Sequence, residues 1–260
     1  MRVTLLGTGT SVGVPIIGCE CRVCRSADPR DQRTRCACHI DGDGISLIID
    51  TGPDFRRQAL REAINRVDAV LFTHHHADHV VGLDDLRPYF FQNTNPIPCF
   101  ARSNTAAVLR RMFRYVFESD GSYALAPKLE LHEVEEPFEV ASRYEPRPPV
   151  RVTPIEVFHG ALPLYGYRLG RFAYMTDTNR IPEASFEHLD DLDVLVLDAL
   201  RHEPHRTHFT IDEAVATARR IGARQTYLIH MTHSVLHAEE DALLPDGIAL
   251  GYDGLSFEVE

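Results

Sequence analysis

The sequence predicts a single layered α/β domain, and three observations lead to that prediction. The chain has 260 residues, a length that suits one large α/β domain or two small ones. Strand-like and helix-like segments mix along the whole chain, and its most polar, proline-rich stretch (residues 142–149) is too short to be a domain linker. Histidine or aspartate follows the carboxyl end of one apolar strand after another, where α/β proteins commonly place binding and catalytic groups.

The amino-terminal half contains three expected strands and two expected helices. A glycine-rich turn at residues 7–13 follows the first strand, but its G-x-G-x-x-x-G spacing and the next residues, Val14-Pro15, do not fit a dinucleotide-binding loop. The second helix is expected to begin at Ser103 or Asn104 and to carry Val108, Met112 and Tyr115 on one face. The strands are expected at residues 3–6, 45–49 and 69–72, and the helices at 54–64 and 103–117.

The carboxyl-terminal half shows the same mixture. Gly170-Arg171 separates two apolar runs and predicts a hairpin. Thr210 and Glu213 form a capping-box pattern, so a helix should begin there and stop near Gly222. The expected strands lie at residues 150–157, 165–169, 172–175, 194–197, 226–229 and 255–259.

Composition excludes several classes of protein. With 27 basic and 38 acidic residues the formal charge is −11, which argues against binding of long nucleic acid through its phosphates. No run of 18 apolar residues occurs, so a transmembrane helix is not expected. The amino terminus lacks the apolar core of a secretory signal, and we expect a cytoplasmic protein.

The strongest motif is His74-x-His76-x-Asp78-His79, directly after the apolar strand at residues 69–72. Neutral imidazoles and carboxylates are ligands for zinc, manganese and iron. Four such groups within six residues can serve two adjacent metal ions, because an extended stretch followed by a turn presents its side chains in two directions. A histidine-rich surface loop is the alternative reading.

This motif after a strand resembles the metallo-β-lactamase superfamily, and the resemblance extends over essentially the whole chain. It implies a four-layer αββα sandwich in one domain, residues 1–260, with a dinuclear metal site at one edge of the sheets. It also implies that His74, His76 and His159 bind one metal, that Asp78, His79 and His230 bind the other, and that Asp177 bridges them. Asp50 and Asp198 also follow strands, and we expect them to orient ligands.

A second cluster, Cys19-x-Cys21-x-x-Cys24, has the composition of a structural zinc site that needs a fourth ligand. His233 is the candidate, and a disulfide or free thiols are the alternatives. The cluster lies in an expected cysteine-rich insertion at about residues 15–40. An early C-x-C-x₂-C with a late His-x-x-His is similar to the phosphodiesterase family of the carbon–phosphorus lyase pathway (PhnP-like), which also makes a homodimer plausible.

Some residues in this region have no assigned role. Cys36 and Cys38 match no pattern, and Cys99 also reads as a core residue. Five arginines surround the cysteines and could contact phosphate or a partner subunit, although a solvated face paired with acidic residues is the simpler reading. They are Arg22, Arg25, Arg30, Arg33 and Arg35.

The resemblance implies a metal-dependent hydrolase, specifically a phosphodiesterase that acts on a small cyclic or nucleotide-like phosphodiester. It also implies two manganese or zinc ions in the active site and one structural zinc. In such sites the nucleophile is a metal-activated hydroxide, and the resemblance implies that Asp78 is a catalytic metal ligand. His208 matches the family's catalytic histidine, which could donate a proton or bind phosphate. His202 and His205 should lie at the rim. A thioesterase or lactonase on the same metals, an RNA nuclease and a non-enzymatic zinc protein are the alternatives.

Overall fold

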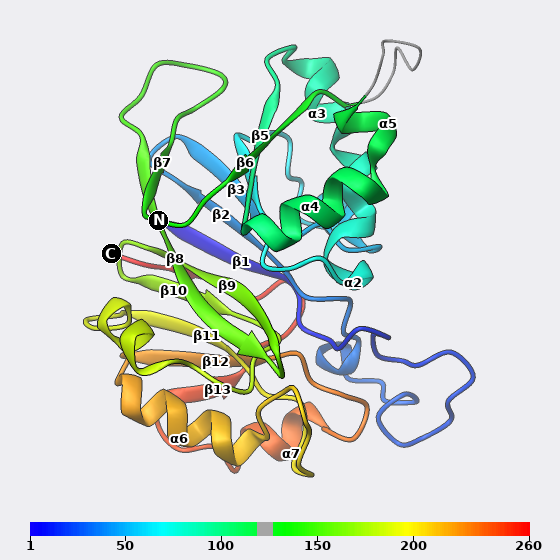
Figure 1. Cartoon of the computed structure of the whole chain (residues 1–260). Helices are drawn as coiled ribbons and strands as arrows, with labels where there is room; N and C mark the ends of the chain where they lie inside the picture. Colours follow the sequence, from blue (N-terminus) through cyan, green and yellow to red (C-terminus); the bar gives the residue numbers. More distant parts are fainter. Residues whose placement is uncertain (119–126) are drawn as a thin grey trace.

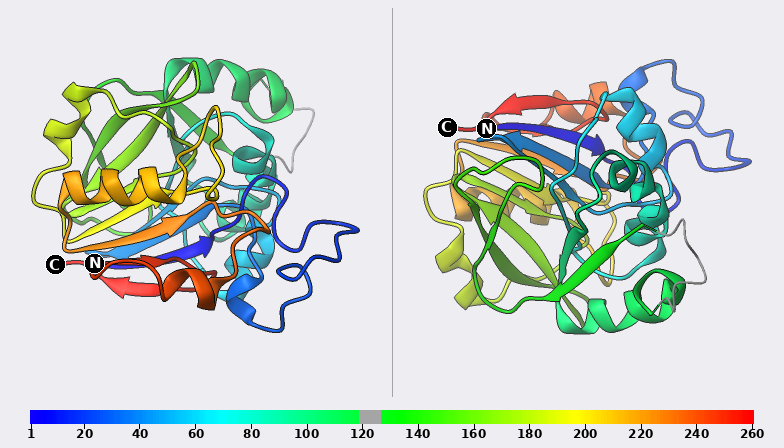
Figure 2. Two further views of the ribbon diagram at one scale, coloured as in Figure 1. Left: turned by 90° about the horizontal axis from the view of Figure 1, so that it is seen from below. Right: turned by 90° about the horizontal axis from the view of Figure 1, so that it is seen from above.

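The computed structural model describes residues 1–118 and 127–260. In this part of the chain two seven-stranded sheets pack face to face, with strand orders β14-β1-β2-β3-β4-β5-β6 and β13-β12-β11-β10-β9-β8-β7. Helices α1 to α5 lie beside the first sheet, and α6 and α7 lie beside the second (Figures 1 and 2). The predicted αββα sandwich in one domain is confirmed.

The first sheet and its helices occupy most of the amino-terminal half. Its strands are β1 (Arg2–Gly7), β2 (Ala37–Gly42), β3 (Ile45–Ile49), β4 (Ala69–Leu71), β5 (Ile97–Ala101), β6 (Leu129–Glu133) and β14 (Ser256–Glu258). Its helices are α1 (Phe55–Arg61), α2 (Ala77–Val80), α3 (Arg87–Gln92), α4 (Ser103–Met112) and α5 (Arg114–Phe117), with 3₁₀ turns at Pro29–Asp31 and Val81–Leu86.

The second sheet comes from the carboxyl-terminal half. Its strands are β7 (Phe138–Val140), β8 (Val150–His159), β9 (Leu162–Leu169), β10 (Phe172–Met175), β11 (Val194–Asp198), β12 (Gln225–Ile229) and β13 (Ile248–Leu250). Its helices are α6 (Ile211–Ile221) and α7 (His237–Asp241), with a 3₁₀ turn at Glu183–His188. None of the helices in the described residues is long and apolar enough to cross a membrane.

Period-two alternation along the strands builds the layers. In β1, Leu5 faces the core between the two sheets, while its neighbour Leu6 faces the helices. Ile49 and Ile48 of β3 divide in the same way. A third core lies between the second sheet and α6, where Ala214 packs with the strand residues. Each sheet is therefore buried on both faces, which explains why its central strands read as continuous apolar runs.

Several local predictions are confirmed. Leu169 pairs with Phe172 across the hairpin at Gly170-Arg171. Thr210 and Glu213 form the capping box of α6, and Gly222 ends that helix in the left-handed conformation at φ 73°. The glycine-rich turn is followed by a long loop and not by an α-helix, which agrees with the prediction that it is not a dinucleotide-binding loop.

The predicted helix at 103–117 is wrong in two respects. It breaks at Phe113 into α4 and α5, because Phe113 turns into the core beside Leu109. The buried face of α4 carries Thr105, Ala106 and Leu109, whereas Met112 and Tyr115 are exposed. The sequence pattern identified the helix, but Tyr115, which was expected on one face with Val108 and Met112, lies beyond the break in α5.

Candidate functional site

Parallel pairing brings the predicted strand-end residues together. Strands β3 and β4 are parallel in the first sheet, and β10, β11 and β12 are parallel in the second, so the carboxyl ends within each set lie at one edge. Three of the residues at these ends have φ values of 53° to 68°, a backbone conformation that is strained for residues other than glycine. They are Asp50, Asp177 and His230.

Asp50 orients His79, as expected. Its Oδ2 lies 2.7 Å from His79 Nδ1, and a carboxylate can only accept, so Nδ1 donates and Nε2 is left facing Asp78 and Asp177. Asp50 is itself held by the backbone N–H and hydroxyl of Thr73, at 2.8 and 2.7 Å. Asp50, Thr73 and His79 are fully buried.

Asp78, His79, Asp177 and His230 form one tight cluster. His79 Nε2 lies 3.2 Å from both Asp78 Oδ2 and Asp177 Oδ2, and His230 Nε2 lies 3.2 Å from Asp177 Oδ1. Despite these short distances, His79 Nε2 and His230 Nε2 make no hydrogen bond and are buried. Buried polar atoms without partners are rare, so they indicate a binding position among the four side chains.

His74, His76 and His159 gather on the other side of Asp177. His74 Nε2 lies 3.0 Å from His76 Nδ1, and the rings of His76 and His159 are 5.2 Å apart. Asp177 Oδ1 is 3.9 Å from His74 Nε2, so Asp177 lies between the two groups. His159 Nδ1 donates to the Thr207 carbonyl at 3.0 Å, which leaves its Nε2 free to face the cluster.

The electrostatics of the cluster favour positive charge. Burial disfavours a charged His230, but Asp177 and Asp198 outweigh burial and raise its pKa to about 9. The same balance, with Asp177 and Asp50 as the carboxylates, raises the pKa of His79 well above its usual value. By contrast, burial and the neighbouring His79 lower the pKa of His74.

The donor set fits divalent metals. Metal–ligand distances of about 2.0–2.2 Å in tetrahedral or octahedral geometry place neighbouring ligand atoms about 2.8–3.6 Å apart, a range that includes the 3.2 Å contacts at His79 and His230. His76 is exposed and His159 half-buried, so the cluster is open to solvent on that side. Imidazole and carboxylate ligands suit zinc and manganese alike.

His208 lies at the edge of this cluster, as predicted. Its ring stacks on that of His230 with 4.5 Å between centroids, and it meets His159 edge-on at 4.6 Å. Asp198 Oδ1 accepts from His208 Nδ1 at 3.1 Å and lies 3.5 Å from Nδ1 of His230, with which it makes no hydrogen bond. Asp198 thus orients His208 and not, as predicted, a metal ligand. His205 and His202 are exposed. The His205 ring lies 5.1 Å from that of His208, whereas His202 Nε2 lies 2.7 Å from Glu240 Oε2 of α7, away from the predicted rim.

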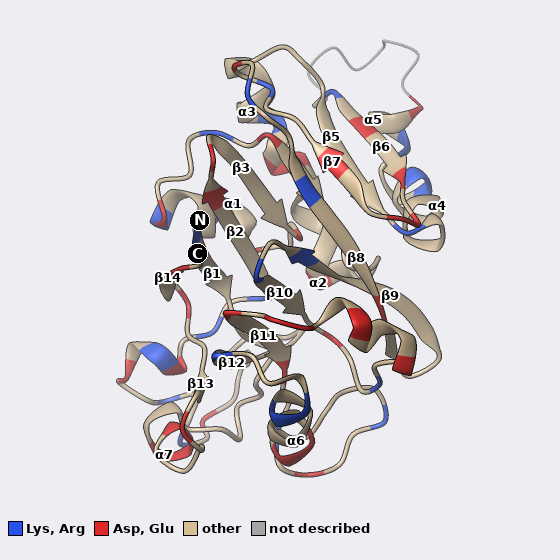
Figure 3. Ribbon diagram, turned by 90° about the vertical axis from the view of Figure 1, so that its left-hand side faces the viewer, with Lys and Arg blue, Asp and Glu red and all other residues tan. Residues whose placement is uncertain are grey.

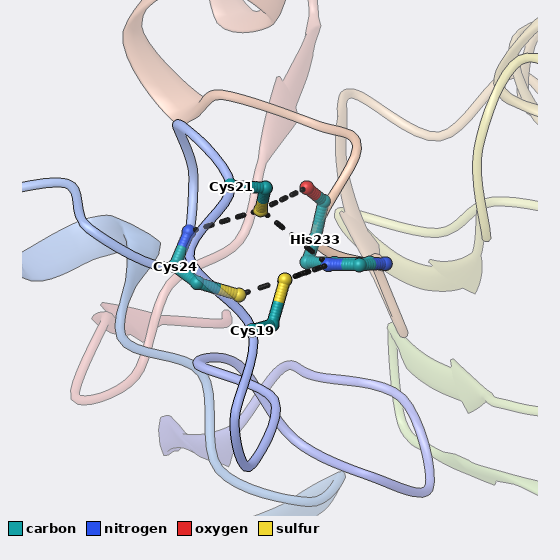
Figure 4. Close-up of side chains that lie close together, drawn as sticks. All are labelled: Cys19, Cys21, Cys24 and His233. Atoms are coloured by element: carbon teal, nitrogen blue, oxygen red, sulfur yellow. Dashed lines mark hydrogen bonds between the residues drawn. The ribbon is translucent and has the colours of Figure 1, made fainter.

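The cysteine cluster also converges with its predicted partner. His233 Nδ1 lies 3.3, 3.5 and 3.7 Å from the sulfur atoms of Cys19, Cys21 and Cys24 (Figure 4). Zinc bonds of about 2.3 Å to sulfur and 2.0–2.1 Å to nitrogen at tetrahedral angles give S···N separations of about 3.5–3.6 Å. A backbone N–H from Cys24 lowers the pKa of Cys21 to about 6, which favours the thiolate that binds metal.

The other cysteines lie outside both clusters. All six are free, so the disulfide alternative finds no support. Cys36, Cys38 and Cys99 are buried, as the core reading of cysteine predicts. Burial raises the pKa of the Cys99 thiol.

Four of the five arginines near the cysteines pair with acidic residues at partly or largely exposed positions, as the simpler reading predicted. The pairs are Arg22–Glu239, Arg25–Glu20, Arg30–Asp28 and Arg35–Asp54. Acidic and basic residues are likewise interspersed on the side of the molecule shown in Figure 3. Arg33 departs from this pattern, because its side chain is fully buried with Asp31.

Sequence reasoning did not identify several supporting residues. Thr73 and the Thr207 carbonyl hold site residues in place but carry no motif of their own. Asp253 accepts from the Thr8 backbone at 2.9 Å, and the Thr8 carbonyl accepts from His230. Position 52, two residues after Asp50, requires glycine because a Cβ there would lie 2.1 Å from the Asp78 carbonyl oxygen. These roles depend on tertiary contacts.

A cavity of about 410 Å³ lies beside the loop that follows His230. Thr232, His233 and Ser234 form one wall, and Arg201 supplies a positive charge three residues after Asp198. The volume is in the range of small-molecule sites. The remaining lining residues are Thr10, Val12, Ile16 and Glu203.

Comparison with known proteins identifies related sequences. The family model of the beta-lactamase superfamily domain matches residues 46–231. An octanoyltransferase of Porphyromonas gingivalis is 42% identical over 98% of this chain but only 51% of its own length. Coenzyme PQQ synthesis protein B of Methylobacterium radiotolerans is 31% identical over 64% of this chain and 54% of its own. The chain thus spans about half the length of these curated relatives.

Solved structures give a fuller match. A crystal structure described as a new diphosphatase from the PhnP family is 44% identical, with a TM-score of 0.91 over 100% of this chain and 98% of that one. Zinc-bound PqqB from Methylobacterium extorquens has a TM-score of 0.79 at 21% identity, covering 99% and 100% of the two chains. The short form of human tRNase Z has a TM-score of 0.73 at 16% identity, covering 100% of both chains. The last two show a shared fold.

Proposed function

The chain belongs to the metallo-β-lactamase superfamily and is a metal-dependent hydrolase, and from this premise we propose that it cleaves a small diester of phosphate or diphosphate. The non-enzymatic zinc protein is thereby rejected. The observation that best supports a diester substrate is the placement of His208, a buried imidazole oriented by Asp198 at the edge of the metal-binding cluster.

The metal assignment follows the two groups of side chains around Asp177. We assign one divalent metal to His74, His76 and His159, whose side chains lie close together. We assign a second to Asp78, His79 and His230, and a bridging position to Asp177. We assign a structural zinc to Cys19, Cys21, Cys24 and His233. When bound, a pair of divalent metals supplies a nucleophilic water at neutral pH and offsets negative charge on phosphate oxygens.

The residues around the metals have separate tasks. Asp198 accepts from His208 Nδ1, so a protonated His208 carries its second proton on Nε2, away from Asp198. That proton can pass to the leaving oxygen of a diester. Without the proton, this oxygen would depart as an alkoxide, which is a poor leaving group. Asp50 and the Thr207 carbonyl fix the rings of His79 and His159 in advance, so little reorganisation is needed when substrate binds.

Two further observations support a small phosphorylated substrate. A solved structure that is 44% identical to this chain over nearly the full length of both is described as a diphosphatase. The cavity beside Thr232 and His233 offers room for one substituent of a diester, and its charged lining is the ion pair of Arg201 and Glu203, 3.7 Å apart. The charge of −11 continues to argue against long RNA.

One observation favours acyl hydrolysis as a second candidate. The 42% identical relative is named an octanoyltransferase, and a nucleophilic water can attack an acyl carbon as well as phosphorus. That name belongs to a protein about twice as long as this chain, so it also describes sequence that has no counterpart here.

A substrate panel separates the candidates. The purified chain would be analysed for metal content and assayed with bis(p-nitrophenyl) phosphate, a dinucleoside diphosphate, a nitrophenyl monoester, a thioester and a lactone. We expect about three metals per chain and turnover of one or both diesters. His208→Ala should lose most turnover of a diester with an alkyl leaving group but much less turnover of bis(p-nitrophenyl) phosphate, whose leaving group needs no proton. His132→Ala, which alters an exposed histidine on β6, should lose neither.

Two results would contradict the proposal. Acyl turnover without diester turnover would retain the metal site but move the function to the thioesterase or lactonase class. If His208→Ala and the chain with the native histidine turn over diesters equally for every leaving group tested, His208 does not have the proposed role.

A further inference from the structure

We propose that Arg33 is a positioning residue that couples the cysteine zinc site to the dinuclear site, by holding the one loop that contributes a ligand to each. This inference rests on the metal sites of the proposed function. It concerns an arginine from the basic stretch whose role neither the sequence motifs nor the diester chemistry explains.

The loop in question comprises residues 230–236, between β12 and α7. His230, at its first position, belongs to the dinuclear cluster, and His233 belongs to the cysteine cluster. The two imidazoles are separated by only two residues. A shift of this loop that moves one of them therefore moves the other, unless the intervening backbone absorbs the change.

Arg33 anchors this loop from inside the protein. Its Nη1 donates to the Thr232 carbonyl at 3.1 Å, and its Nη2 donates to the Val235 carbonyl at 2.8 Å, so the guanidinium spans His233. Asp31 accepts from the same Nη2 at 3.0 Å and from the backbone N–H of His237 at 2.8 Å. The planar, forked guanidinium makes these bonds simultaneously, which an ammonium group cannot reproduce.

The same arginine also faces the cysteine segment through its backbone. The N–H and carbonyl of Arg33 pair with the carbonyl and N–H of Val14, each at 2.8 Å. Val14 packs with Val23 and Cys24 in the small apolar cluster beneath the cysteines. Arg33 is therefore attached to the segment that carries three of the zinc ligands and to the loop that carries the fourth.

Burial distinguishes Arg33 from its neighbour Arg22. The Arg33 side chain is 0% exposed, and removing its hydrogen bonds would leave the buried Val235 carbonyl without this donor and the buried Asp31 carboxylate without its guanidinium. Arg22 also reaches across to this region, where it pairs with Glu239 of α7, but its side chain is 73% exposed. An exposed ion pair contributes little, so Arg22 is a matched control.

The consequence is a reciprocal coupling of two metal affinities. If zinc at the cysteines fixes His233, then Arg33 and the loop transmit that order to His230, and the dinuclear site should bind metal more tightly. Manganese is a suitable probe, because it prefers oxygen and nitrogen ligands to thiolates and reports on the dinuclear site alone.

The test measures Mn²⁺ affinity by the loss of the free-ion electron paramagnetic resonance signal. The proteins are the full chain with zinc at the cysteines, Cys24→Ser, Arg33→Lys, Arg22→Met, and the double variants that combine each arginine change with Cys24→Ser. We expect Cys24→Ser to weaken Mn²⁺ binding by roughly tenfold in the native and Arg22→Met backgrounds, and by less than about twofold in the Arg33→Lys background.

Equal Mn²⁺ affinity with and without zinc at the cysteines would overturn the coupling, and that comparison needs no Arg33 variant. A full tenfold effect in the Arg33→Lys background would overturn the role of Arg33. Because Mn²⁺ binding is measured without substrate, neither result depends on which ester is cleaved. A chain that binds no Mn²⁺ in any variant would instead refute the dinuclear assignment itself, and the coupling with it.

Discussion

The dinuclear cluster and the cysteine cluster are built in different ways. The first gathers residues from the ends of strands in both sheets, and its histidines are held by buried partners such as Asp50, Asp198 and the Thr207 carbonyl. The second lies mostly in the long segment between β1 and β2, which projects from the body of the molecule (Figure 1). Its apolar support is one small cluster around Val14, Val23 and Cys24.

This difference indicates how each site depends on metal. The strand-end residues are oriented by the fold before any ion binds, so we expect their geometry to survive metal removal. The cysteine segment has few buried contacts, and in such segments the free energy of zinc binding is largely a free energy of local folding. Metal should therefore be needed for chemistry at the first site and for order at the second.

The largest expected effect comes from Asp78→Ala. Asp78 Oδ2 is 3.2 Å from His79 Nε2 within the cluster, and its loss should weaken one metal position. Metal stabilisation of the transition state amounts to several kcal/mol, so kcat/KM should fall by about 10³-fold or more. Diester turnover and thermal unfolding of the same samples would be measured.

The comparison requires that the Tm of Asp78→Ala, measured without added metal, change little. A variant that loses activity because it no longer folds would break the contrast between the two sites.

The next effect depends on the leaving group. His208→Ala removes the proposed general acid, so turnover of an alkyl diester should fall by about 10²–10³-fold. A p-nitrophenolate leaves without protonation, and its diester should lose much less. The ratio of the two losses would be obtained from kcat on matched substrates. Equal losses would assign His208 to phosphate binding instead of proton transfer.

The sequence predicted the residues that the structure brings together better than it predicted the individual strands, for a physical reason. The histidines and aspartates stand in a compact motif or directly after apolar strands, so pattern and placement agree. Strands β2, β5, β6, β7 and β13 were not predicted, because they are short or mixed in polarity. In β6, Leu129 is buried but most of the other side chains are half-buried or exposed, and β5 contains Pro98.

The buried position of Arg33 escaped prediction, unlike that of the strand-end aspartates. Arg33 and Arg22 belong to the same basic stretch, and the sequence offers no means of separating them. Only the folded chain shows that one side chain is enclosed by the loop that carries His233 while the other extends into solvent. Burial of a charge is decided by contacts between residues about 200 positions apart, such as Arg33 with Val235.

A moderate effect is expected from Asp50→Asn. The amide side chain keeps the shape of Asp50 but removes the charge that holds His79 Nδ1–H, so the ring loses its preferred orientation. Partners of this kind contribute about 10–100-fold in metal affinity. Mn²⁺ binding would be measured for Asp50→Asn beside Asp41→Asn, which neutralises an exposed carboxylate on β2. A smaller loss in Asp50→Asn than in Asp41→Asn would contradict the orienting role.

The smallest effect on activity is expected from Cys24→Ser, although its effect on local order should be large. Without a complete set of thiolates the cysteine site should lose zinc, and amide hydrogen exchange should become faster in the projecting segment at residues 16–31 while the strands keep their protection. At saturating Mn²⁺ the catalytic residues remain in place, so kcat should fall by less than about threefold, since a change in metal affinity is overcome by excess metal. The coupling through Arg33 would then be visible only at limiting Mn²⁺. If exchange instead accelerates throughout β11 and β12, the two sites share one folding unit, and the contrast drawn between them does not hold.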